Sequence, residues 1–186
     1  MSAASQPKWS TVKPKLAALS QSELIELVKV LFEQSADNKL CIATRLAPET
    51  LGAEAIEPYR ELIVKQFFPK RGLGKLNLRE ARQEIRDYSK ATSDTGGTLE
   101  LMMIYIETGT AFTREYGDIS EAFYNSLESV LGELAKILKS REGQPYYRQY
   151  APRLKQLNAE TSYIGWGYGD SVEEVVDELE AALSRA

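Results

Sequence analysis

The 186-residue sequence contains no histidine and only one cysteine, Cys41. The absence of histidine excludes Ser-His-Asp and Cys-His catalysis, zinc bound by histidine, and a histidine-based pH switch. A single cysteine excludes an internal disulfide and suits a reducing compartment. Because no base lies near Cys41 in the sequence, we expect this thiol to be a small core residue and not a nucleophile.

Long apolar runs are also missing. No stretch approaches the roughly 20 residues that a transmembrane helix needs, and the first nine residues lack the apolar core of a signal peptide. We therefore expect a cytoplasmic protein with no membrane partner, and no motif requires a cofactor. The length suits one domain with a sizeable core. We predict a flexible N-terminus over residues 1–10 and a single helical domain over residues 11–186.

Helical periodicity runs through most of the chain. Ser20 and Glu23 form a capping box before a helix that reaches about Gln34, and its apolar residues recur three and four positions apart. Further helices are expected at about 37–46, 58–68, 77–91, 99–116, 118–142, 146–160 and 170–184, with a short one after Ser10. This pattern predicts an all-α protein with eight or nine helices in antiparallel pairs, either an irregular bundle or a short HEAT-like α-solenoid.

Single residues mark several expected helix ends. Pro58 is placed at a helix start, residues 92–97 are read as a loop, and Gly117 is placed at a helix end. Asp118 and Asp170 are expected to cap the helices that follow them.

The strongest local charge lies between residues 65 and 90, with eight basic and three acidic residues, or +5, in a chain of net charge −4. Pro69, Gly72 and Gly74 indicate a loop, and Asn77 is expected to cap the next helix. The candidate anion- or partner-binding residues are Lys70, Arg71, Lys75, Arg79, Arg82 and Arg86, of which the last four are expected to share one helix face.

A second interpretation of these cations is structural, because they can pair with acidic residues elsewhere in the fold. The segment from Asp170 to Ala186 carries six acidic residues and one basic residue, a local charge of −5. This complementarity leads to the hypothesis that the C-terminal helix meets the basic helix, for example with Glu174 near Arg82, within one chain or between subunits.

The run from Gly72 to Lys75 resembles part of a phosphate-binding P-loop. Pro69 stands where the first glycine of G-x-x-x-x-G-K-[ST] belongs, and Leu76 stands where a hydroxyl would bind magnesium. The P-loop signature is therefore not met, although backbone amides at the helix start after Asn77 can still hold a phosphate.

A second unusual loop spans residues 163–169 and contains three glycines and three aromatic residues. Tyr163, Trp166 and Tyr168 are candidates for an aromatic binding loop. The alternative is a plug packed onto the helices, since exposed aromatic surface is costly.

Four short motifs follow one another along the chain: residues 22–27; residues 67–72 with Gly74 and Lys75; residues 116–119 with Phe123, Tyr124 and Ser126; and residues 164–167. In this ordered combination, which covers nearly the whole chain, the sequence resembles a family of bacterial proteins that share a domain of unknown function. The resemblance implies a cytoplasmic helical protein in which both unusual loops, FFPKRGxGK and IGWG, belong to a family pattern together with the YGDI element. It carries over no activity.

These observations lead to three hypotheses of function. The first is a protein-interaction or scaffold module that binds an unidentified protein through the basic surface of residues 65–90. The second is phosphate or nucleic-acid binding by the same cations, which steep salt dependence would reveal. The third, less favoured, is a histidine-free enzyme with carboxylates in a deep cleft, for example Asp87 with Asp94 or Glu115 with Asp118. The sequence leaves the oligomeric state open.

Overall fold

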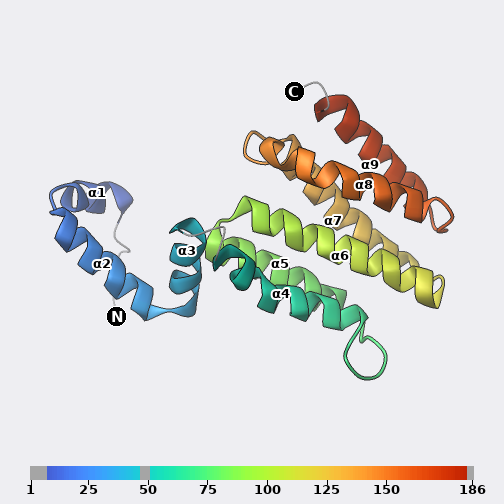
Figure 1. Cartoon of the computed structure of the whole chain (residues 1–186), viewed down its shortest axis with the longest axis horizontal. Helices are drawn as coiled ribbons and strands as arrows, with labels where there is room; N and C mark the ends of the chain where they lie inside the picture. Colours follow the sequence, from blue (N-terminus) through green and yellow to red (C-terminus); the bar gives the residue numbers. More distant parts are fainter. Residues whose placement is uncertain (1–7, 47–50, 184–186) are drawn as a thin grey trace, which may run out of the picture.

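The computed structural model describes residues 8–46 and 51–183, and over these ranges it contains helices and no strand (Figure 1). Nine α-helices and one 3₁₀ turn are present there: α1 (Trp9–Ala17), α2 (Gln21–Gln34), α3 (Ala36–Leu46), α4 (Leu51–Phe67), α5 (Leu78–Thr92), α6 (Thr95–Tyr116), α7 (Glu121–Lys139), η1 (Gln144–Tyr146), α8 (Tyr147–Thr161) and α9 (Tyr168–Leu183). The all-α prediction is confirmed. The predicted end of the last helix, Ser184, lies outside the described residues.

From α4 onward, consecutive helices form three antiparallel hairpins, α4–α5, α6–α7 and α8–α9, which stack in chain order (Figure 1). α6 packs against α4, α5, α7 and α8 and is therefore the central helix. Its sequence fits this place, because a helix that is apolar on all sides is buried on all sides. The large buried side chains of α6 are Leu99, Leu101, Met102, Met103, Tyr105, Ile106 and Phe112.

Buried tyrosine hydroxyls hold neighbouring helices in register. Tyr168, which is fully buried at the start of α9, shares a 2.8 Å hydrogen bond with Thr110 of α6. Tyr124 of α7 shares a 2.6 Å bond with Thr113 of α6 and donates to Asp118 at 3.0 Å. Burial raises the pKa of both tyrosines, so the hydroxyls stay protonated. Because an unpaired buried hydroxyl is costly, these bonds favour one packing of α6 against α7 and α9.

The loop predicted at 92–97 is wrong for most of its length, because α6 already begins at Thr95. A Cβ atom on Gly97 would collide with the side chain of Tyr88. The glycine lets Tyr88 approach and donate a 2.7 Å hydrogen bond to Asp94. The glycine therefore serves close packing and not a flexible connection.

Two prolines lie inside helices, and one of them, Pro58, lies deeper than predicted. α4 begins at Leu51, so Pro58 is inside the helix, and Pro14 lies in the second turn of α1. Pro58 cannot donate a bond to the carbonyl of Glu54. Pro58 and Glu54 are both exposed, so water can donate a hydrogen bond to the Glu54 carbonyl.

Three predicted helix signals are confirmed. Ser20 accepts a bond from the Glu23 backbone at 3.3 Å, and the Ser20 backbone donates to the Glu23 carboxylate at 2.7 Å. Asn77 accepts from the backbone of Glu80 at 3.4 Å. Gly117 ends α6 with a φ of +84°, a conformation that favours glycine.

Two predicted caps are wrong. Ser120, and not Asp118, caps α7 by accepting a 3.3 Å bond from the backbone three residues on. The Asp118 carboxylate is instead used in the tertiary bond from Tyr124. α9 begins at Tyr168, so Asp170 lies in the first helical turn, where its charge still favours the helix dipole.

The N-terminal helices α1 and α2 form an arm that projects from the stack (Figure 1). No described residue of either helix is buried. α1 begins at Trp9, inside the segment predicted as a flexible terminus, and residues 1–7 lie outside the described residues.

α3 connects the arm to α4 and α5. The Leu46 side chain, at the end of α3, is exposed. Cys41 is half-buried, with its Sγ 4.0 Å from the carbonyl oxygen of Thr92.

Candidate functional site

Three connections gather at one end of the stack, which we call the loop end (right-hand side of Figure 1). They are residues 68–77, 117–120 and 162–167, and they follow α4, α6 and α8. Because consecutive helices are antiparallel, every second connection returns to the same end. The basic loop and the aromatic loop, far apart in the sequence, therefore share one end of the molecule.

The basic loop is fixed at its base. The backbone N–H of Leu76 donates a 2.9 Å bond to the carbonyl of Gln66 in α4. A Cβ atom on Gly74 would collide with the backbone of Phe67, so only glycine permits this close return of the chain. Leu76 itself adopts a φ of +51°, and its side chain packs against the core. This anchoring leaves the tip, residues 70–73, projecting into solvent.

Four of the predicted cations lie exposed in or beside this loop: Lys70, Arg71, Lys75 and Arg79. Over residues 8–46 and 51–183, none of the four forms an ion pair. Lys75 precedes the cap of α5 and lies in the loop, so its predicted place on the helix face is wrong. Leu73, at the tip, is 75% exposed. The loop therefore presents an apolar side chain among unpaired positive charges.

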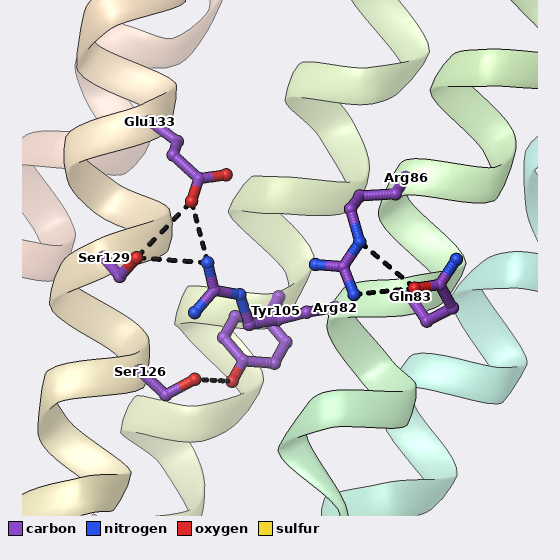
Figure 2. Close-up of polar contacts among 7 residues, drawn as sticks. All are labelled: Arg82, Gln83, Arg86, Tyr105, Ser126, Ser129 and Glu133. Atoms are coloured by element: carbon purple, nitrogen blue, oxygen red, sulfur yellow. Dashed lines mark hydrogen bonds and ion pairs between the residues drawn. The ribbon is translucent and has the colours of Figure 1, made fainter.

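The remaining two arginines are held by the helices, as Figure 2 shows. Arg82 Nη2 lies 2.7 Å from Glu133 and 3.1 Å from Ser129, both on α7. Arg86 donates to the side-chain oxygen of Gln83, one turn earlier on α5, at 2.8 and 3.2 Å. Arg82 thus links α5 to α7, which agrees with the structural interpretation for this residue.

The hypothesis that the acidic C-terminal helix meets the basic helix within one chain is wrong. α9 packs on α7 and α8, and the α6–α7 hairpin separates it from α5 (Figure 1). Its carboxylates pair locally, Glu178 with Lys139 at 2.7 Å and Glu180 with Lys155 at 2.9 Å. The stacking of hairpins in chain order, which local charge does not reveal, explains the difference.

The three aromatic candidates differ in their exposure to solvent. Tyr163 and Trp166 are 67% and 59% exposed, whereas Tyr168 is buried in the core. Arg114, at the end of α6, donates a 2.8 Å bond to the Tyr163 hydroxyl, which raises the pKa of the guanidinium. Trp166 has a φ of +63°. The loop thus acts as a plug through Tyr168 and presents the other two rings to solvent.

Sequence reasoning missed the segment that lies between the two loops, residues 116–118. Tyr116 is exposed at the end of α6, and its ring centroid lies 6.3 Å from that of Phe68, which adjoins the basic loop. On the other side, a Cβ atom on Gly165 would lie 3.5 Å from Oδ2 of Asp118. The YGDI element was a signal for this role, but only the alternation of antiparallel helices places it between the other two loops.

An acidic groove of about 950 Å³ lies between α3, α4 and α5. Burial and the neighbouring Asp87 raise the pKa of Glu84 in this groove. The carboxylates that line it are Asp37, Glu54, Glu84 and Asp87. Among the described residues, no three His, Cys, Asp or Glu side chains gather closely enough to hold a metal ion.

The carboxylate pairs considered from the sequence are engaged in the fold. Asp94 accepts a 2.7 Å bond from Tyr88, and Asp118 accepts a 3.0 Å bond from Tyr124. One member of each pair therefore serves as a structural acceptor. The geometry favours the loop end over the acidic groove as the candidate site.

No helix among the described residues is long and apolar enough to cross a membrane. Comparison of the chain with protein-family models, with curated proteins and with solved structures finds no match in any of the three. The resemblance to a bacterial family of unknown function therefore stays a prediction from the motifs of the sequence.

Proposed function

We propose that this chain is a cytoplasmic protein-interaction module of the bacterial family that its motifs resemble, and that its loop end binds an acidic surface on a partner protein. The observation that carries the proposal is the tip of the basic loop. There, Leu73 is 75% exposed beside cations that form no ion pair within the described residues.

A protein partner fits this surface because protein interfaces combine apolar and aromatic anchors with arginine. Leu73, Tyr116 and Trp166 are exposed at the loop end, and positive charge surrounds the first of them. The base of the loop is already anchored to α4, so less conformational entropy is lost when a partner binds.

The same cations also support the second candidate, a phosphate or nucleic-acid ligand. If four cations neutralise four phosphates of a duplex, the logarithm of the affinity should fall with the logarithm of salt concentration with a slope of about −3.6. An interface that also buries Leu73 and Tyr116 should show a shallower slope.

The test is a binding measurement with paired charge reversals. The partner is captured by chemical cross-linking from a lysate of the source organism and purified. Its affinity is then measured for the wild type, for Arg71→Glu with Lys75→Glu, for Leu73→Ala, and for the control Arg148→Glu. We expect the double reversal and the leucine variant each to weaken binding about tenfold or more, or about 1.4 kcal/mol.

The control Arg148 is an exposed cation at the opposite end of the stack, near the start of α8. Its reversal should change the affinity less than about twofold, since surface charges separated by more than a Debye length interact weakly. Equal effects of the loop and control variants would contradict the proposal. A slope near −3.6 with an oligonucleotide, and no effect of Leu73→Ala, would favour the nucleic-acid ligand instead.

A further inference from the structure

The projecting arm carries an apolar helix face that nothing in the described chain covers. Six large apolar side chains of α2 are 37–59% exposed, and five of them share one face: Ile25, Leu27, Val28, Leu31 and Phe32. On a helix of 100° per residue, these side chains and Leu24 fall within an arc of about 160°, the width of a face that normally packs against another element. Val30 points away from this arc.

The corner between α2 and α3 is defined by specific bonds. Ser35 separates the two helices and accepts a 3.0 Å bond from the backbone of Asn38. The Asn38 side chain donates a 2.6 Å bond to the carbonyl of Leu31, in the last turn of α2. Lys39 lies 5.8 Å from the ring centroid of Phe32, a cation–π contact. These contacts fix the corner between α2 and α3 and hold α2 away from the stack. The fold itself therefore leaves the apolar face of α2 exposed.

Four apolar residues of the face lie symmetrically about Val28, whereas Leu27 is mirrored by Lys29. Ile25 and Leu31 lie three residues to either side, and Leu24 and Phe32 lie four residues to either side. A two-fold axis at the helix centre maps such a pattern onto itself, as an isologous contact requires. We propose that α2 packs antiparallel against α2 of a second copy of this chain, with the two Val28 side chains on the axis.

The charges of the arm lie outside the apolar face of α2. The segment 8–17 carries Lys8, Lys13 and Lys15 and no acidic residue, whereas α2 carries three glutamates and one lysine. None of these charges forms an ion pair within the described residues. At 100° per residue, the four charged residues of α2 all fall outside the apolar arc, so antiparallel packing of the two faces buries no charge.

The apolar area of the face is at the lower end of protein interfaces and suits a weak dimer. With residue surfaces of roughly 150–200 Å², the exposed apolar side chains offer about 400 Å² per copy, and two faces together bury about 800 Å². The neighbouring α1, with Trp9 exposed, adds surface toward the roughly 1,000 Å² of a specific interface. This contact does not involve the loop end, so its test is independent of the proposed function.

The first experiment measures the mass of the full chain by sedimentation velocity between about 1 and 100 μM. We expect a particle of twice 20.8 kDa for the wild type. Val28→Glu places two carboxylates against each other on the axis and should raise the dissociation constant about 100-fold or more. Val30→Glu, on the same helix but outside the face, should change it less than about threefold.

Circular dichroism confirms that each variant is folded, which is expected because no residue of α2 is buried. A wild type that stays monomeric at about 100 μM overturns the proposal. So does a dimer that tolerates Val28→Glu, or one that both glutamate variants disrupt equally.

A second experiment fixes the orientation by disulfide trapping in a Cys41→Ser background. When chains with Leu24→Cys and chains with Phe32→Cys are mixed and oxidised, the antiparallel contact should link unlike chains, since their Cα atoms come within disulfide range. Preferential linking of like chains would show a parallel contact, and no linking would show that another surface forms the dimer; either result overturns the proposal.

Discussion

At the scale of single residues, two glycines on facing helices show how position decides the effect of a methyl group. Gly109 of α6 is buried, and a Cβ atom there would collide with Leu127 of α7. Leu127 is itself fully buried, so its side chain has little room to move aside. Gly132 of α7 is exposed, and a Cβ atom there would meet no neighbouring side chain within 4 Å.

We therefore predict opposite effects of the same substitution. Gly109→Ala should lower the free energy of unfolding by about 1–3 kcal/mol, because overpacking outweighs the gain in helix propensity. Gly132→Ala should raise it by about 0.5–1 kcal/mol, because alanine restricts the unfolded chain and favours the helix. Urea titration measures both changes, and a neutral Gly109→Ala would mean that α6 and α7 can separate slightly at this contact.

The residue scale is also where sequence reasoning was weakest. Gly97 and Tyr168 were assigned to loops because glycine and mixed aromatic–glycine runs are typical of loops. Both assignments failed for tertiary reasons, since Gly97 admits the side chain of Tyr88 and Tyr168 fills the core beside Thr110. Such contacts join residues that the local pattern does not relate.

At the scale of elements, local signals performed better. The capping box of Ser20 and the cap at Asn77 were predicted correctly because both partners lie within three residues of each other. The partner of Arg82 was not predictable in this way, since Glu133 lies 51 residues away and on a different hairpin. Helix existence is encoded locally, whereas the pairing of helix faces depends on how the hairpins stack.

The capping box offers a prediction for the arm alone. Ser20→Ala should destabilise α2 by about 1 kcal/mol, so its backbone amides should exchange with deuterium about five times faster. The measurement is made on the Val28→Glu background, so that a dimer does not protect the helix. Ser22→Ala, two residues further on and outside the box, is the matched control and should leave exchange unchanged. Equal acceleration by both variants would mean that Ser20 stabilises α2 by something other than its cap.

At the scale of the whole molecule, chain-order stacking produces two separate surfaces. The hairpins from α4 to α9 bring the three unusual connections to one end, while the arm projects from the other (Figure 1). The sequence identified the individual loops, and it identified the helices, but it contained no local signal for which connections share an end. That information comes from the alternation of antiparallel helices once their number is known.

Because the arm projects from the stack, we predict that it contributes little to the stability of the stack. A chain that begins at Ser35 keeps the serine that caps α3 and loses only residues without a buried side chain among those described. Its thermal midpoint should lie within about 3 °C of that of the Val28→Glu variant, because a change of 1 kcal/mol shifts the midpoint by about 2–4 °C at this chain length. The wild type should instead melt at a temperature that rises with protein concentration, since only a dimer gains stability by mass action. A drop of about 10 °C or more in the shortened chain would show that α1 and α2 pack against the stack in solution, whereas an unchanged midpoint would show that the arm does not stabilise the stack.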